Sequence, residues 1–423
     1  MTNSDLEESL ETRPSRAWLF FMYLFLIFDY GRPQDSIKIV GYLHPAMVVV
    51  IILTIFLLAN FGKIDFKIPQ IKILWFFIFL LAAHVPFAIN NHAAFNTTRS
   101  ILLFMPFILS FIICVDSVNQ FKKAIIVLIC LMVYQAQYAV THGGMGTGNQ
   151  FLDENDFALY INTWLPFCFA LFLSTKNIIA KILFGIFSLL GLGAVVISFS
   201  RGGFLGLIGM VVIYWLFSSK KLLMLVFLIL GAVTVIYVSN LASHGRISHQ
   251  KKGSFLEEMS SSTDAKTGTG RERVESWKSG WNMFLHNPLG VGGGNFPVRF
   301  SEYQTSYFTR FMWGRQAHSL WFTLIPELGI FGIAIYAWLL MVNIKHIFRL
   351  RKYSSFFDDR EAILLKNLSV AFLASLAGYF VSATFISVLY YAHYWYLTGI
   401  IASANLIVTE KMNEIESSDP SVA

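Results

Sequence analysis

The sequence is poor in charged residues. Asp, Glu, Lys and Arg make up 13% of its 423 residues, whereas 56% are hydrophobic and 16% are aromatic. In soluble globular domains about 25% of the residues are charged. The composition therefore excludes an ordinary soluble protein and indicates one that crosses a membrane several times.

Cysteine is also scarce, with three residues in the chain. Cys114, Cys130 and Cys168 all fall inside apolar segments, and none lies in the longest polar segment, residues 240–317. A disulfide framework or a thiolate metal site needs several cysteines at defined spacings. We therefore expect neither of these, and we expect no metal and no cofactor.

Segments that alternate apolar and polar residues over about ten positions, as membrane β-barrels require, are lacking as well. An apolar segment of about 17–25 residues crosses the bilayer as a helix, which satisfies its own backbone hydrogen bonds. We therefore predict an all-α polytopic membrane protein with about 12 transmembrane helices. The twelve segments lie near residues 17–30, 43–61, 71–89, 100–116, 121–140, 157–174, 178–199, 202–217, 221–239, 318–344, 363–386 and 390–409.

The distribution of charge predicts the orientation of these helices. The first residues are polar and include Glu7, Glu8 and Glu11, unlike the basic start of a cleaved signal peptide, so we expect the first helix to be retained. With a cytoplasmic N-terminus, the cytoplasmic loops hold fourteen Lys and Arg residues and the opposite short loops hold four. The lysines of the cytoplasmic loops account for most of the formal net charge of +7, which therefore needs no nucleic-acid partner to explain it. The predicted parts are a cytoplasmic N-terminus (1–16), transmembrane helices 1–9 (17–239), a large periplasmic loop (240–317), transmembrane helices 10–12 (318–409) and a cytoplasmic tail (410–423).

The large loop contains a patterned region. It holds ten basic and six acidic residues, a net charge of +4. From Arg271 to Leu285 apolar side chains recur every three or four residues, which predicts an amphipathic helix that stops at residues 286–288. The glycine-rich residues 289–296 then allow close approach of the backbone to a substrate or an anion-binding nest. They lack the lysine and the preceding strand of a nucleotide P-loop, so that interpretation is rejected.

Aromatic residues gather near the end of the chain. Tyr390, Tyr391, Tyr394, Trp395 and Tyr396 stand at the start of the last apolar segment. Tyr and Trp are enriched where membrane helices meet water. We therefore predict that these residues form an interfacial aromatic belt.

Four polar residues, 153–156, open the sixth apolar segment. Asn155 or Asp156 is an ordinary choice for the N-cap of a helix. Capping needs only one polar residue, however, so Asn155 and Asp156 are also candidates for binding substrate hydroxyls. The sequence leaves both interpretations open.

An arginine stands between the seventh and eighth segments with almost no loop around it. Arg201 could be a snorkelling residue at the membrane surface, but an arginine so close to hydrocarbon is expected to have a partner. The eighth helix starts at the outer face, and Gly202 and Gly203 would leave its first amides unshielded. We therefore predict a phosphate site at Arg201, Gly202 and Gly203.

A histidine marks the start of the tenth segment. His318 could be no more than a helix cap, but it follows Arg310 and Arg315, and its near-neutral pKa suits proton transfer. We therefore predict a functional role for His318 at the outer end of the tenth helix.

These motifs together resemble the O-antigen ligase and polymerase superfamily of bacterial inner-membrane proteins. The resemblance is strongest over residues 150–335. It rests on residues 155–158, on 200–203, on 273–277 leading into 287–292, and on 317–319 with 327–329.

The resemblance implies a multi-pass protein of the bacterial cell inner membrane that works in lipopolysaccharide biosynthesis with a periplasmic active site. It implies a metal-independent glycosyltransferase that moves a glycan from undecaprenyl diphosphate to an acceptor hydroxyl of the lipid A core or another glycan. The catalytic residues of the family fall on Arg201, Arg273 and His318, although Gly270-Arg271 leaves Arg271 as an alternative to Arg273. The residues that we expect to bind substrate are Arg271, Gly202, Gly203, Asn155, Asp156, Trp277 and Arg315.

Other functions compete with a ligase. A polymerase or a protein O-glycan ligase of the same superfamily would use the same donor with another acceptor. A transporter or flippase for lipid-linked sugars would bind the donor without chemistry. Transporters place ionisable residues near the middle of the membrane, often in repeated halves. The cations of this chain are predicted at the outer helix ends and no internal repeat is evident, which favours an enzyme.

Overall fold

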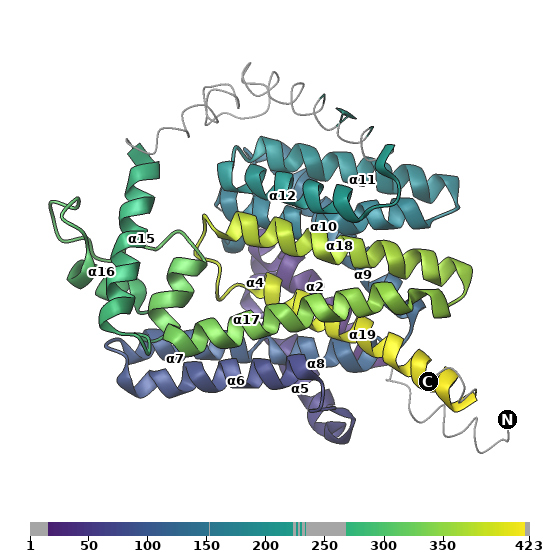
Figure 1. Cartoon of the computed structure of the whole chain (residues 1–423), viewed down its shortest axis with the longest axis horizontal. Helices are drawn as coiled ribbons and strands as arrows, with labels where there is room; N and C mark the ends of the chain where they lie inside the picture. Colours follow the sequence, from purple (N-terminus) through teal and green to yellow (C-terminus); the bar gives the residue numbers. More distant parts are fainter. Residues whose placement is uncertain are drawn as a thin grey trace.

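The computed structural model describes residues 16–151, 153–222, 226, 229, 230, 233 and 268–418. Every regular element in this part of the chain is a helix (Figure 1). The predicted N-terminal tail up to residue 15, most of the predicted ninth helix at 221–239, loop residues 240–267 and the last five residues lie outside the described residues.

The first half of the chain forms mostly apolar helices, several of them interrupted near the membrane ends by proline or by short 3-10 and π turns. In chain order they are α2 (Arg16–Leu26), η1 (Ile27–Gly31), α3 (Pro33–Ser36), α4 (Lys38–Tyr42), α5 (Pro45–Ala59), η2 (Phe61–Lys63), α6 (Pro69–His84), η3 (Val85–Phe87), α7 (Asn91–Leu102), α8 (Met105–Cys114), α9 (Val118–Thr141) and η4 (Asn149–Phe151). Proline is the first residue of α3, α5 and α6, where its missing N–H costs no hydrogen bond.

The second half contains the longest helices and those of the large loop. They are α10 (Glu154–Ser174), α11 (Ile178–Ile197), α12 (Arg201–Phe217), α15 (Gly268–His286), α16 (Phe296–Tyr303), α17 (Trp321–Tyr353), η6 (Ser354–Phe356), α18 (Asp359–Ala383) and α19 (Ala392–Ser418). The amphipathic helix predicted for residues 271–285 is confirmed as α15, which ends at the predicted stop.

Seven described helices are long and apolar enough to cross a membrane, and two shorter apolar helices, Pro45–Ala59 and Arg201–Phe217, accompany them. This confirms an all-α polytopic membrane protein, whereas the number twelve stays a prediction. In Figure 1 the long helices lie side by side, while α15 and α16 lie at one end of the bundle, across the helix ends. We call this end the loop end.

The interior of the bundle is built around α10. All its residues from Asp156 to Leu171 are buried, and it packs against α11, α12 and α18. Asn162 Nδ2 donates to the carbonyl oxygen of Gly203 on α12 at 2.7 Å and to Ser382 Oγ on α18 at 3.1 Å. Such bonds stabilise helix association where hydrocarbon offers no alternative partner. One side chain of α10 therefore fixes two neighbouring helices.

The predicted aromatic belt is wrong for most of its members. Tyr394, Trp395 and Tyr396 are at most 1% exposed, and Trp395 packs against Phe77 of α6 with ring centroids 4.7 Å apart. These three consecutive rings point in different directions around α19, and all are buried because α19 packs against α6, α8 and α17. Tyr391 alone is exposed.

Candidate functional site

The start of α12 is tightly packed against α10. Ser200 caps the helix by accepting a hydrogen bond from Gly203 N at 2.9 Å, and its hydroxyl donates to Asn155 Oδ1 at 2.7 Å. A Cβ on Gly203 would collide with Ala158, and one on Gly202 would lie 3.1 Å from the Cβ of Phe385. The two glycines therefore permit close packing, and the Gly203 amide is used by the cap rather than left unshielded. Arg201 follows Ser200 directly, as the first residue of α12.

The cap of α10 differs from the prediction. Asp153, not Asn155 or Asp156, is the N-cap, because its carboxylate accepts the Asn155 backbone N–H at 2.7 Å and Asn155 Nδ2 at 2.8 Å. Asn155 is thereby held between Asp153 and Ser200. Asp156 is 9% exposed, and its carboxylate lies beside Tyr391: burial, and then this carboxylate, raise the pKa of Tyr391 to about 12. A substrate role for Asn155 and Asp156 stays a prediction.

Helix α15 is fixed to the segment before α17 by Trp277. Its ring stacks on Phe322 with centroids 5.4 Å apart and an angle of 6° between the planes. Its Nε1 donates to the carbonyl oxygen of Ala317 at 3.1 Å. Trp277 therefore has a positioning role, since it holds α15 next to His318.

Arg315 also joins the segment before α17 to α15. Its Nε donates to Ser276 Oγ at 2.8 Å, and its Nη2 forms an ion pair with Glu272 Oε2 at 2.9 Å. The guanidinium also lies over the Phe308 ring, 4.9 Å from its centroid. These contacts commit Arg315 to the fold of the loop, and its predicted binding of substrate stays untested.

The geometry separates the two candidate arginines of α15. Two positions along a helix differ by about 200° in direction, so Arg271 and Arg273 point to opposite sides. Arg271 lies over the Tyr307 ring, 4.8 Å from its centroid. The pKa of Arg273 is lowered by burial and by Arg201, an effect that acidic groups at the start of α10 oppose. Arg273 is therefore close enough to Arg201 for the two charges to interact.

His318 lies within the field of the same charges. Partial burial of the imidazole lowers the pKa of His318, and so do Arg273 and Arg315, whereas Asp153 and Glu272 act in the opposite direction. The ring is therefore neutral at neutral pH. We call Arg201, Arg273 and His318 the cationic cluster, after its two arginines; it gathers groups from α12, α15 and the segment before α17.

The prediction that the tenth helix begins at His318 needs a correction. The helix begins at Trp321, and His318 precedes it with a left-handed φ of 48°. Leu320 N donates to the carbonyl oxygen of Ala383 at 2.9 Å, and Trp321 Nε1 donates to Thr384 Oγ1 at 3.0 Å. These bonds join the first residue of α17 and the residue before it to the end of α18. His318 therefore lies in a bend of the backbone and not in a helical turn. A left-handed backbone is uncommon for a residue other than glycine.

The glycine-rich residues pack against α17 and do not lie open to a substrate. Val291 N and Gly292 N donate to the carbonyl oxygens of Pro326 and Glu327 at 3.0 and 2.8 Å. Gly290 has a φ of 103°, and a Cβ there would lie 2.5 Å from the Glu327 carbonyl oxygen. Glycine is thus needed for contact with another helix, which corrects the expected contact with substrate.

Glu327 fastens this contact. Its side chain is 1% exposed and accepts hydrogen bonds from Gly294 N at 2.8 Å, Phe296 N at 2.9 Å and the Tyr390 hydroxyl at 2.6 Å. We call these four residues the Glu327 junction. Sequence reasoning missed it, although a carboxylate inside an apolar segment is a signal, because such groups are rare in membrane helices and need partners.

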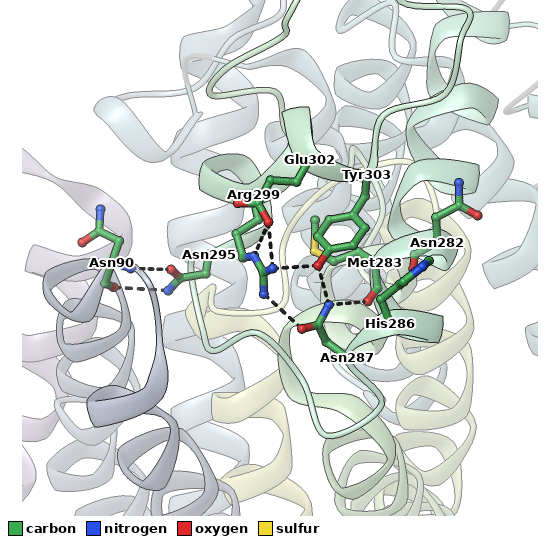
Figure 2. Close-up of polar contacts among 9 residues, drawn as sticks. All are labelled: Asn90, Asn282, Met283, His286, Asn287, Asn295, Arg299, Glu302 and Tyr303. Carbon is green, nitrogen blue, oxygen red and sulfur yellow. Dashed lines mark hydrogen bonds and ion pairs between the residues drawn. The ribbon is translucent and has the colours of Figure 1, made fainter.

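A second polar network extends the junction (Figure 2). Asn295 Oδ1 accepts from Asn90 N at 2.9 Å, which ties the loop to the start of α7. Arg299 donates to Asn287 Oδ1 at 3.1 Å and to the Tyr303 hydroxyl at 2.6 Å, and it pairs with Glu302 at 2.7 Å. The loop is therefore held against α17 and the start of α7, and these contacts help to position α15.

Comparison with known proteins supports the resemblance drawn from the motifs. Residues 186–337 match a family model described as O-antigen ligase. The matched region contains the whole cationic cluster and the Glu327 carboxylate, whereas Asn155 and Asp156 lie before it. A search of curated proteins finds no match for the chain.

Proposed function

We propose that this chain, whose residues 186–337 match a family model described as O-antigen ligase, is a glycosyltransferase of the bacterial inner membrane. It moves a glycan from undecaprenyl diphosphate to a hydroxyl group of the lipid A core on the periplasmic face. The observation that supports this most is the cationic cluster, in which Arg201, Arg273 and His318 come from three separate segments.

The two arginines suit a diphosphate. Burial, and then the like charge of Arg201, lower the pKa of Arg273 and so disfavour its charged form, and an anion between the two arginines offsets this cost. When the bond between the anomeric carbon and the diphosphate oxygen breaks, negative charge grows on the leaving group. Guanidinium groups fixed in place stabilise this charge through short ionic hydrogen bonds. Arg201 and Arg273 would thus act on the leaving group.

His318 suits the acceptor. The new bond joins the acceptor oxygen to the anomeric carbon, and the hydroxyl proton must leave. A neutral imidazole can accept this proton, and burial together with the two nearby arginines lowers the pKa of His318, which favours its neutral form. His318 would therefore be the general base, or would orient the hydroxyl.

Transfer by purified protein tests the proposal. The full chain would be given undecaprenyl-diphosphate glycan and lipid A core in EDTA, and the products would be resolved by mass. We expect transfer by the native protein and a loss of about 100-fold or more for Arg201→Ala, Arg273→Ala and His318→Ala. Lys278→Ala, which removes an exposed charge from α15, should behave like the native protein.

Three outcomes would contradict parts of the proposal. Donor binding without any product would favour a transporter. Transfer to a second lipid-linked glycan or to a protein, but not to lipid A core, would make the chain a polymerase or a protein O-glycan ligase. A larger loss for Arg271→Ala than for Arg273→Ala would reverse the assignment of the loop arginine.

A further inference from the structure

A cavity of about 480 Å³ opens at the end of the bundle opposite the loop end. It lies among the first residues of α9, α11 and α18 and the last residues of α10. Helix α10 has 21 residues and begins beside the cationic cluster, so about 30 Å separates the cavity from that cluster. The cavity therefore belongs to a different site.

Cations from three elements line the cavity. Lys122 belongs to α9, Lys176 to the α10–α11 connection and Arg360 to α18. Among the described residues no carboxylate lies within 4.0 Å of their side-chain nitrogens. Two acidic residues, Asp358 and Glu361, also line the cavity, which leaves one more cation than carboxylates in the lining. Asp358 is used as the cap of α18, where one oxygen accepts from the backbone N–H groups of Arg360 and Glu361 at 2.9 and 2.8 Å. The donors of the three cations are thus available to a ligand.

The helix ends add to this positive field. The N-termini of α9, α11 and α18 all meet the cavity, against one C-terminus, that of α10. Each N-terminus contributes a partial positive charge. A ligand with an anionic group fits this arrangement better than a neutral one.

The rest of the lining is apolar and adjoins the membrane. Val118, Leu171 and Leu364 line the cavity and are at most 6% exposed. At the start of α11, next to Lys176, Ile178 and Ile182 are 66% and 55% exposed. Exposed isoleucines on a helix that can cross the bilayer face lipid. The cavity therefore joins a cationic rim to an apolar floor at the edge of the hydrocarbon.

We propose that this cavity binds the head group of an anionic phospholipid from the leaflet that it faces. The phosphodiester contacts Lys122, Lys176 and Arg360, and the glycerol part rests on the apolar floor. Basic pockets between membrane helices are suited to such head groups. A free phosphate offers the same charge but makes no use of the floor.

Lipid retention by the full chain tests this site. The protein would be purified in a zwitterionic detergent and exposed to phosphatidylglycerol or phosphatidylcholine, and bound lipid would be counted by native mass spectrometry. The test variant is Lys122→Gln/Lys176→Gln/Arg360→Gln. The control is Lys63→Gln/Lys67→Gln/Lys345→Gln, which removes three exposed cations outside the cavity lining at the same end.

We expect the native chain and the control to retain phosphatidylglycerol over phosphatidylcholine, and the test variant to bind it about tenfold more weakly. Equal weakening in both triple variants would overturn the proposal, since general surface charge would then explain retention. Full displacement of the lipid by an equal concentration of inorganic phosphate would also overturn it. The melting temperatures of both variants serve to check folding, and Lys122→Gln alone, a single surface change, gives a second measurement if the triple variant is unstable.

Discussion

Replacement of Glu327 should release the glycine-rich segment from α17. The carboxylate has two oxygens that only accept, and three donors surround them: two backbone N–H groups and the Tyr390 hydroxyl. Glutamine keeps one oxygen but turns an NH₂ group towards at least one of those donors. Since the Gly294 and Phe296 amides bond to different oxygens, Glu327→Gln leaves one of the two amides unsatisfied.

The structure sets the size of the effect. A buried donor without a partner costs about 1–3 kcal/mol, so Glu327→Gln should favour local opening by about 5- to 150-fold. Glu327→Ala leaves both amides and the hydroxyl without their acceptor, and should cost about 2–6 kcal/mol for the amides alone. Because the junction positions α15, glycan transfer should fall in the same order.

Hydrogen exchange of residues 288–298 in lipid nanodiscs measures this opening directly. Exchange should be faster in Glu327→Gln than in the native chain, and faster again in Glu327→Ala. Glu302→Gln is the matched control: it removes an exposed carboxylate paired with Arg299 from the same loop, and such pairs contribute at most about 1 kcal/mol. If exchange of residues 288–298 were the same in all four proteins, the Glu327 junction would not hold the loop.

Three shorter predictions follow from the site. Burial and then the neighbouring arginines lower the pKa of His318 from its ordinary value of 6.5, so the midpoint of the fall in transfer on acidification should lie below pH 6.5; a pH profile of kcat measures this midpoint, and a midpoint above 6.5 would contradict a role of His318 as the base. Trp277→Ala removes the stack on Phe322 and should reduce transfer more than Trp277→Phe, which keeps an aromatic ring there. Comparison of kcat for the two variants at matched protein levels tests this order. Gly203→Ala forces a methyl group against Ala158 and should destabilise the chain by about 1–3 kcal/mol, seen as a lower melting temperature, whereas an unchanged value would mean that α12 can shift.

Much of the helical architecture follows from local pattern. Apolar length predicts the membrane helices because a helix in lipid must satisfy its own backbone. The three- and four-residue spacing from Arg271 to Leu285 predicts α15, and Pro288 predicts where it stops. The grouping of Arg201 with a loop arginine and His318 follows from their predicted outer positions and from the family resemblance; the charges of Arg201 and Arg273, and of Arg273 and His318, interact in the structure, while the catalytic roles stay predictions.

Other features depend on contacts between distant segments, which local pattern does not contain. Spacing shows that Arg271 and Arg273 point apart, but only the docking of Trp277 on Phe322 decides which one faces α12. The bend at His318 follows from the bond between Leu320 and the end of α18. Capping by Asp153 was missed because several polar residues in a row compete for that position.

The hydrogen bond from Leu320 N to the carbonyl oxygen of Ala383 has a consequence for the order in which the chain folds as it is synthesised. Arg201 leaves the ribosome long before His318, and the bend that carries His318 is fixed by a residue at the far end of α18. A chain still being inserted into the membrane therefore contains the arginine without the histidine in place. On this basis Arg201 and His318 reach their final arrangement only after α18 has been synthesised and packed against the segment before α17.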